Sequence, residues 1–161
     1  MRDGSIPAAV VFAALGLMLA FAPRKTAPVC VALAIALAWI AGQSPFGVPV
    51  TDTAIMACWT AVFMLAVGIF WRQPLTRLAT AALSAIAGIV AGTAIAASAG
   101  ASPLWPAALA VTVIVPATIA VDRDYAIAPR VVMSWLVAVG LLAALLPQVV
   151  SHPGYVADHR G

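Results

Sequence analysis

Six runs of apolar residues, separated by short polar turns, make up most of this 161-residue chain. A helix that crosses a bilayer core about 30 Å thick needs roughly 20 mostly apolar residues, and about 17 to 25 is the usual range. All six runs meet or nearly meet this requirement. They extend over residues 6–22, 27–42, 52–71, 78–100, 103–121 and 131–150. The pattern predicts an all-α fold, a polytopic membrane helical bundle of about six transmembrane helices with short loops, in a single transmembrane domain over residues 1–161.

The composition leaves little material for a water-exposed surface. Hydrophobic residues make up 65% of the chain and charged residues only 8%, whereas about a quarter of the residues of soluble domains are charged. Glu and Asn are absent, and Lys25 is the only lysine. These counts exclude a large extramembrane domain. The basic residues are spread between the apolar runs without forming a basic stripe, so the net charge of +3 does not indicate nucleic acid as a partner.

The positive residues predict how the bundle lies across the membrane. Six of them fall in the first, third and fifth loops, and two lie on the opposite side. Because loops rich in Arg and Lys stay in the cytoplasm, both termini are expected on the outer, periplasmic side of a bacterial cytoplasmic (inner) membrane. The six are Arg24, Lys25, Arg72, Arg77, Arg123 and Arg130, and the two are Arg2 and Arg160.

The N-terminal run admits a second interpretation. Ala20-Phe21-Ala22 resembles a signal-peptidase site that follows an apolar stretch. However, Pro23 would follow the cut, Asp3 offsets Arg2, and the basic pair comes after the apolar run rather than before it. We therefore expect the first run to be a retained helix.

No set of residues predicts a catalytic, cofactor-binding or metal site. His152 and His159 are the only histidines, both in the tail after the last run, and no Glu exists to act as an acid or a base. Cys30 and Cys58 lie in different apolar runs without the spacing of zinc ligands, a pattern typical of inert buried thiols. The sequence therefore predicts neither an enzyme nor a bound cofactor.

Asp52 is the ionisable residue nearest the interior of a run, in Thr51-Asp52-Thr53 at the outer end of the third run. Its carboxylate suits a helix cap, where it accepts hydrogen bonds from free backbone N–H groups. The alternative is a coupling role, in which the buried acid carries a proton during transport. We expect the cap.

The fourth run contains small residues at every fourth position, at Ser84, Gly88, Gly92, Ala96 and Gly100. This spacing places the small residues along one stripe, where another helix backbone can approach closely and gain van der Waals contact. The stripe predicts that this helix lies at an interface. Packing within one chain is the first expectation, and a dimer contact or a face lining a substrate path is the alternative.

The fifth run contains Pro116, which removes one backbone hydrogen bond and crowds the carbonyl group of Thr112. A kink is expected there, near the middle of the membrane. Together with Thr93 and Thr118, this region predicts a mildly polar patch and a candidate substrate pathway. The alternative is a proline kink without a functional role.

The tryptophans lie mainly within a few residues of the ends of the apolar runs. Such placement is typical of the aromatic belts that anchor helices at the membrane surface. Trp71 beside Arg72 indicates a cytoplasmic edge, and Trp105 indicates an outer edge. The five are Trp39, Trp59, Trp71, Trp105 and Trp135.

From residue 44 to residue 140 the order of features resembles the membrane module of the fusaric acid resistance or aromatic acid exporter family. The matching features are an outer proline-aromatic turn, a basic loop, a helix rich in small residues and a tyrosine-containing loop. They correspond to Ser44-Pro45-Phe46, residues 72–77, residues 88–100, and Asp124-Tyr125-Ala126 before Arg130. The resemblance implies one half of an inner-membrane exporter that requires a second copy or a partner.

Two functions fit these features. The first is a small inner-membrane transporter or permease component for an unidentified small molecule, which acts as an oligomer with the fourth and fifth helices around its pathway. The second is a non-transporting structural or assembly subunit of a larger membrane complex. Both imply the lipid bilayer as surroundings, and copies of the same chain or other membrane subunits as partners.

Overall fold

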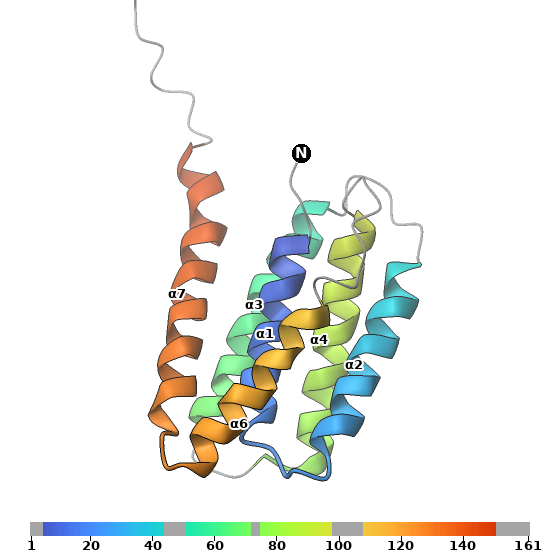
Figure 1. The fold of residues 1–161 in the computed structure, drawn as a ribbon. Coiled ribbons are helices and arrows are strands. Elements are labelled where there is room, and N and C mark those ends of the chain that lie inside the picture. Colours follow the sequence, from blue (N-terminus) through green and yellow to red (C-terminus); the bar gives the residue numbers. More distant parts are fainter. Residues whose placement is uncertain (1–4, 44–50, 72–74, 98–107, 151–161) are drawn as a thin grey trace, which may run out of the picture.

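The computed structural model of the protein describes residues 5–43, 51–71, 75–97 and 108–150. This part of the chain is helical and contains no strand, which confirms the all-α prediction (Figure 1). The elements are α1 (Ser5–Leu19), α2 (Ala27–Gly42), α3 (Thr51–Phe70), α4 (Arg77–Ala97), the 3₁₀ helix η2 (Ala110–Val113), α6 (Ile114–Asp122) and α7 (Ile127–Val150).

Successive helices run in opposite directions. In Figure 1, α1, α3 and α6 descend, whereas α2, α4 and α7 ascend. The connections from α1 to α2 and from α6 to α7 therefore lie together at the lower end, which we call the basic end. This arrangement is the one that the short loops predict, because a connection of a few residues can only join antiparallel neighbours.

The helices differ in length from the expected spans. Three are long and apolar enough to cross a membrane, over Thr53–Phe70, Arg77–Ala97 and Ile127–Leu145. Three further apolar helices are shorter, over Ile6–Leu19, Ala27–Gly42 and Ala110–Asp122. The first helix ends at Leu19 rather than at residue 22, and the last begins at Ile127 rather than at residue 131. A bundle with six complete spans stays a prediction.

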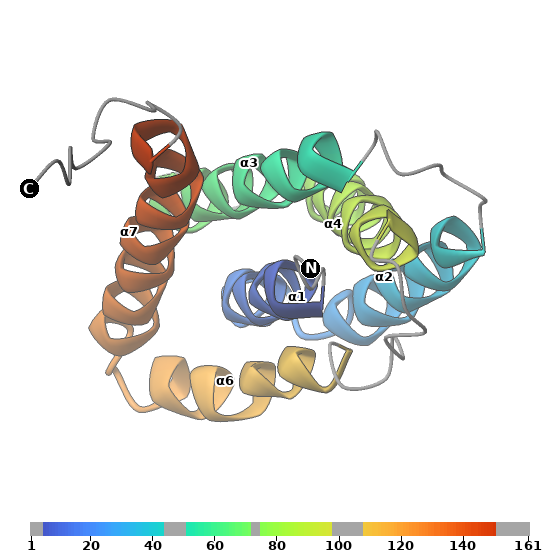
Figure 2. The same cartoon turned by 90° about the horizontal axis from the view of Figure 1, so that it is seen from above.

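Helix α1 occupies the centre of the bundle. Seen from above, the other helices surround it (Figure 2), and it contacts α3, α4, η2, α6 and α7. Most of its side chains are buried, and the less buried ones lie along one face, at Ile6, Ala9, Val10 and Ala13. Fully buried examples are Val11, Phe12, Leu15, Met18 and Leu19.

The outer helices pack on one another through small residues. Helices α2 and α4 run parallel and form the most extensive contact, while α7 packs chiefly on α3. A Cβ atom added at Gly140 of α7 would lie 2.9 Å from the ring of Trp59 on α3. Trp59 is therefore buried between two helices, and its expected place in an aromatic belt was wrong.

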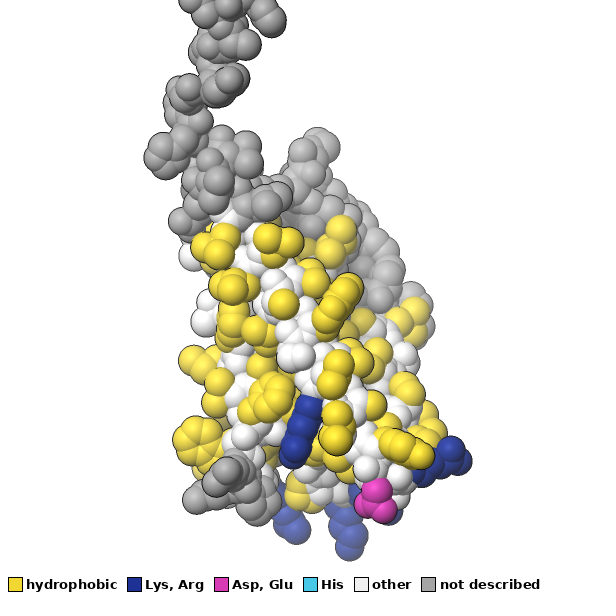
Figure 3. All heavy atoms as spheres, turned by 90° about the vertical axis from the view of Figure 1, so that its left-hand side faces the viewer, with side chains coloured by type: hydrophobic (Ala, Val, Ile, Leu, Met, Phe, Trp, Pro, Cys, Tyr) yellow, Lys and Arg dark blue, Asp and Glu magenta, His cyan; other side chains and the backbone are white. Residues whose placement is uncertain are grey.

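The outside of the bundle is apolar. Large hydrophobic side chains are exposed on every outer helix, and Figure 3 shows them covering the face above a cluster of Lys and Arg at the basic end. Three tryptophans belong to this surface, with exposed fractions of 61% at Trp39, 63% at Trp71 and 71% at Trp135. Trp105 lies outside the described residues. An apolar exterior of this extent is far larger than that of a water-soluble monomer.

Candidate functional site

The small-residue stripe of α4 lies against α2 of the same chain. A Cβ atom added at Gly88 would lie 2.3 Å from the carbonyl oxygen of Ala34, and one added at Gly92 would lie 2.3 Å from that of Ala38. Only glycine allows the two backbones to approach so closely. Ser84 is fully buried on the same helix. Gly100 lies outside the described residues.

The hydroxyl groups that the sequence singled out donate to their own helices. In each case the acceptor is a backbone carbonyl oxygen three or four residues earlier. Each hydroxyl group is therefore hydrogen-bonded within its own segment and needs no acceptor on a neighbouring helix. The bonds run from Ser84 to Thr80 (2.8 Å), from Thr93 to Val90 (2.9 Å), from Thr112 to Leu109 (2.7 Å) and from Thr118 to Ile114.

The three threonines do not form one patch. Thr93 belongs to α4, whereas Thr112 and Thr118 belong to η2 and α6, and α1 lies between these two sides of the bundle (Figure 2). Thr112 is exposed, and Thr93 and Thr118 are half-buried. The structure thus separates residues that the sequence grouped as one polar region.

The helical winding changes just before Pro116, where the sequence predicts a kink. Residues Ala110–Val113 form a 3₁₀ helix, and regular α-helix resumes at Ile114. Pro116 has no N–H group to bond the carbonyl oxygen of Thr112, so the preceding turn can tighten at little cost. This change of winding lies next to the position of the predicted kink, and the kink itself stays a prediction.

Gly16 of α1 accommodates this irregular turn, and sequence reasoning missed it. A Cβ atom added at Gly16 would lie 2.8 Å from the carbonyl oxygen of Val111 and 3.1 Å from the backbone nitrogen of Ile114. The 3₁₀ turn therefore packs directly on the backbone of the central helix. A lone glycine inside an apolar run was the available signal.

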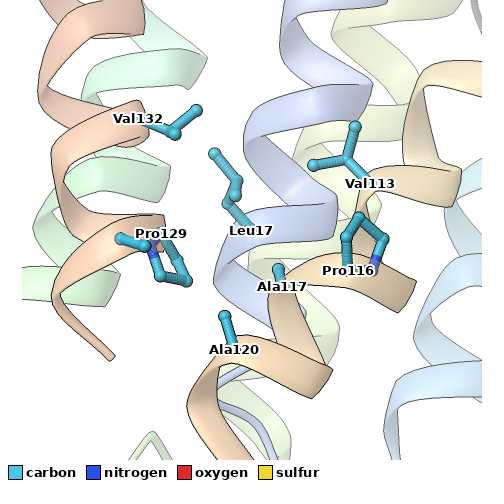
Figure 4. Close-up of a pocket in the computed structure, with 8 residues that line it drawn as sticks. Leu17, Val113, Pro116, Ala117, Ala120, Pro129 and Val132 are labelled. Atoms are coloured by element: carbon cyan, nitrogen blue, oxygen red, sulfur yellow. The ribbon is translucent and has the colours of Figure 1, made fainter. Parts of the chain in front are cut away.

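A groove lies beside this contact, bounded by α1, α6 and α7 (Figure 4). It has a volume of about 180 Å³, is partly open to the outside and is lined almost entirely by apolar atoms. Two prolines from opposite walls, Pro116 and Pro129, point toward it. The lining comprises Leu17 from α1, Val113, Pro116, Ala117 and Ala120 from η2 and α6, and Ala128, Pro129 and Val132 from α7.

Polar contacts gather where the groove reaches the basic end. The guanidinium group of Arg24 donates a hydrogen bond to the carboxylate of Asp122 and forms an ion pair with it. This hydrogen bond, together with the charge of the carboxylate, raises the pKa of Arg24 above its ordinary value. The guanidinium carbon of Arg130 lies 5.6 Å from the centre of the Phe21 ring, within the range of a cation–π contact.

The turn between α6 and α7 joins two walls of the groove. Asp124 has a φ of 63°, in the left-handed region. The N–H group of Tyr125 bonds the carbonyl oxygen of Ala120 at 2.8 Å, and that of Asp124 bonds Val121 at 3.3 Å. These two bonds and the left-handed residue define a Schellman motif, which ends α6.

The remaining candidate residues lie elsewhere. Asp52 is the second residue of α3, and its side chain is not among those that the structure describes. Cys30 and Cys58 are free and buried on different helices. In the described ranges, no three His, Cys, Asp or Glu side chains come together as a metal site would require. His152 and His159 lie outside these ranges.

Comparison of the chain with protein-family models, curated proteins and solved structures finds no match. The resemblance to the aromatic acid exporters therefore stays a hypothesis. The groove and its surroundings are the structural features from which a function can be inferred.

Proposed function

We propose that this chain is an inner-membrane protein whose six apolar segments cross the bilayer, with the basic end in the cytoplasm. The apolar exterior of the described helices supports this placement, because such a surface is stable in lipid and unstable in water. The gathering of basic side chains at one end supports the orientation (Figure 3).

Within this placement, we propose that the protein acts as a transporter or permease component for a small, largely apolar molecule. The supporting observation is the groove bounded by α1, α6 and α7, which is partly open to the outside and lies next to an interrupted helix. Interrupted helices adjoin the substrate sites of many secondary transporters. An exporter of aromatic acids, the class suggested by the sequence resemblance, is the specific form of this proposal.

Efflux of radiolabelled benzoate from preloaded bacterial cells tests the proposal. Cells that produce the wild-type chain should lose benzoate several times faster than cells that carry an empty vector. Ala117→Trp places a large ring in the groove, because Ala117 lines it and is buried, and should abolish the difference. Val115→Trp is the matched control, because Val115 is 58% exposed and does not line the groove.

Equal efflux from wild-type and vector cells would refute export of this class of acid. Equal efflux from the Ala117→Trp and wild-type cells would refute a role for the groove. Both variants must first be shown to reach the membrane in similar amounts, by fractionation and immunoblotting.

A second function is favoured by the exposure of α7. Only 17% of its apolar stretch is buried, compared with 44% for α3. A long apolar face of this kind suits a subunit that packs against another membrane protein. Native mass spectrometry after mild detergent extraction distinguishes the two functions, because a fixed complex with other chains indicates a scaffold and a homo-oligomer indicates a transporter.

A further inference from the structure

The dimensions and lining of the groove limit what it can hold. Its volume of about 180 Å³ is below the roughly 300 Å³ at which pockets for drug-sized ligands begin. Its walls are apolar, and it is partly open to the outside. One flexible hydrocarbon chain fits this description better than a rigid molecule with several polar groups.

A positive charge lies at the basic end of the same groove. Leu17 of α1 lines the groove, and Phe21 lies in the turn just after α1, where its N–H group bonds the carbonyl oxygen of Met18 at 3.1 Å. The guanidinium carbon of Arg130 lies 5.6 Å from the centre of the Phe21 ring, and Arg130 directly follows the lining residue Pro129 in α7. Arg130 is therefore next in sequence to one wall of the groove, and its guanidinium group lies beside the turn that follows α1.

This charge is not cancelled by a neighbouring carboxylate. Asp122 pairs with Arg24, and among the described residues Arg130 forms no ion pair. Basic side chains outnumber acidic ones at this end of the described structure. The basic ones are Arg24, Lys25, Arg77, Arg123 and Arg130, and the acidic ones are Asp122 and Asp124.

We propose that the groove binds one acyl chain of an anionic phospholipid, with the lipid phosphate held by Arg130. The order of features matches such a lipid, because the charge lies at the membrane surface and the apolar walls extend toward the bilayer centre. Basic pockets between membrane helices on the cytoplasmic side bind anionic headgroups in this way, and an arginine can donate two hydrogen bonds to one phosphate. The proposal gives this groove an occupant other than the transported molecule proposed above, and it rests only on the proposed membrane placement.

Native mass spectrometry of the purified full-length chain in a non-ionic detergent tests the proposal. The probes are dioleoyl phosphatidylglycerol and dioleoyl phosphatidylcholine, which share their acyl chains and differ in headgroup charge. The wild-type chain should bind the first at least about fivefold more tightly, since one arginine near a headgroup contributes on this scale. Arg130→Gln should remove the preference.

Two further variants complete the design. Arg77→Gln removes a positive charge at the same end from α4, which does not line the groove, and should bind both lipids as the wild type does. Ala120→Trp should weaken the binding of both lipids, because the ring fills the space for the acyl chain. If Ala120→Trp unfolds, the comparison of Arg130→Gln with Arg77→Gln still tests the proposal. Both arginines are exposed, so neither substitution should disturb the fold.

Equal binding of the two lipids by the wild type would overturn the proposal. Equal losses of lipid preference in Arg130→Gln and Arg77→Gln would also overturn it, because they would indicate a diffuse effect of charge. So would the release of a second copy of the chain when lipid is added, because the groove would then be the contact between two copies. A protein that fractionates with the soluble proteins of the cell would refute the membrane placement itself. A membrane-extracted protein without lipid preference would refute this inference only.

Discussion

At the scale of single residues, contacts of glycine control how closely the helices approach. Gly88 and Gly92 lie against carbonyl groups of α2, and Gly16 lies against the backbone of η2. In each case the neighbouring atoms belong to backbone, which cannot rotate away as a side chain can. A single methyl group at these positions forces the helices apart.

Gly88→Ala and Gly92→Ala are therefore expected to destabilise the folded protein by about 1–3 kcal/mol each, the usual cost of overpacking. Thermal unfolding in detergent, followed with a thiol-reactive dye, measures the effect because Cys30 and Cys58 are 2% and 0% exposed in the folded chain. Gly68→Ala is the control, since its added Cβ atom meets neighbours no closer than 3.5 Å. An unchanged melting temperature in the Gly88 and Gly92 variants would contradict the parallel packing of α2 and α4.

The larger substitutions Gly88→Leu and Gly92→Leu are expected to abolish assembly of the bundle and, with it, transport. Leucine cannot fit where even a Cβ atom would lie 2.3 Å from a carbonyl oxygen. Membrane fractionation and the benzoate assay together measure both losses. Full activity of both variants would show that the stripe has no role in either.

The backbone conformation of Asp124 predicts how substitutions at this position change the stability of the protein. Its φ of 63° is unfavourable for most side chains, tolerated by Asp and free of strain for Gly. Asp124→Gly should keep or slightly raise the melting temperature, whereas Asp124→Val should lower it, at a cost of about 1–2 kcal/mol. The opposite order would show that the turn does not have this geometry.

At the scale of elements, the irregular turn η2 and the helix α6 behave as one interrupted unit. Pro116 deprives the turn of a backbone hydrogen bond, and Gly16 provides the space in which the turn packs. The two features belong to segments about a hundred residues apart in the sequence, and the structure brings them together. The groove walls begin at this contact.

Pro116→Ala should restore the missing backbone hydrogen bond and slow amide hydrogen exchange over residues 110–117. Pro129→Ala is the matched control, because Pro129 lies in the first turn of α7, where N–H groups have no partner within the helix. Exchange around residue 129 should change little. Equal exchange in Pro116→Ala and the wild type would mean that the tight turn is maintained by its packing on α1 alone.

At the scale of the whole molecule, the alternating helix directions place the α1–α2 and α6–α7 connections at the same end, the basic end. Lys25 lies at the basic end, and Gln43 lies at the opposite end of α2. Both are exposed. They provide two positions from which the orientation in the membrane can be measured.

A membrane-impermeant maleimide should label Gln43→Cys in cells with a permeable outer membrane and an intact inner membrane, and Lys25→Cys only after the inner membrane is opened. The native cysteines are buried and should contribute little background. The reverse pattern would invert the proposed orientation. Labelling of both positions in the intact cells would contradict a crossing by α2.

The sequence by itself determined the helical class, the approximate helix ends, the basic end and the position of the interruption at Pro116. These properties depend on neighbours within a few residues: the length of an apolar run, a turn residue, a charge or a missing N–H group. Only the tertiary structure decided that α1 is central, that Gly88 and Gly92 face α2, that Trp59 is buried and that α1, α6 and α7 enclose a groove. The physical reason is that these runs are apolar on all sides. Without a polar face to indicate which side points outward, the arrangement is decided by which small residues let two backbones approach, and those residues come from segments far apart in the sequence.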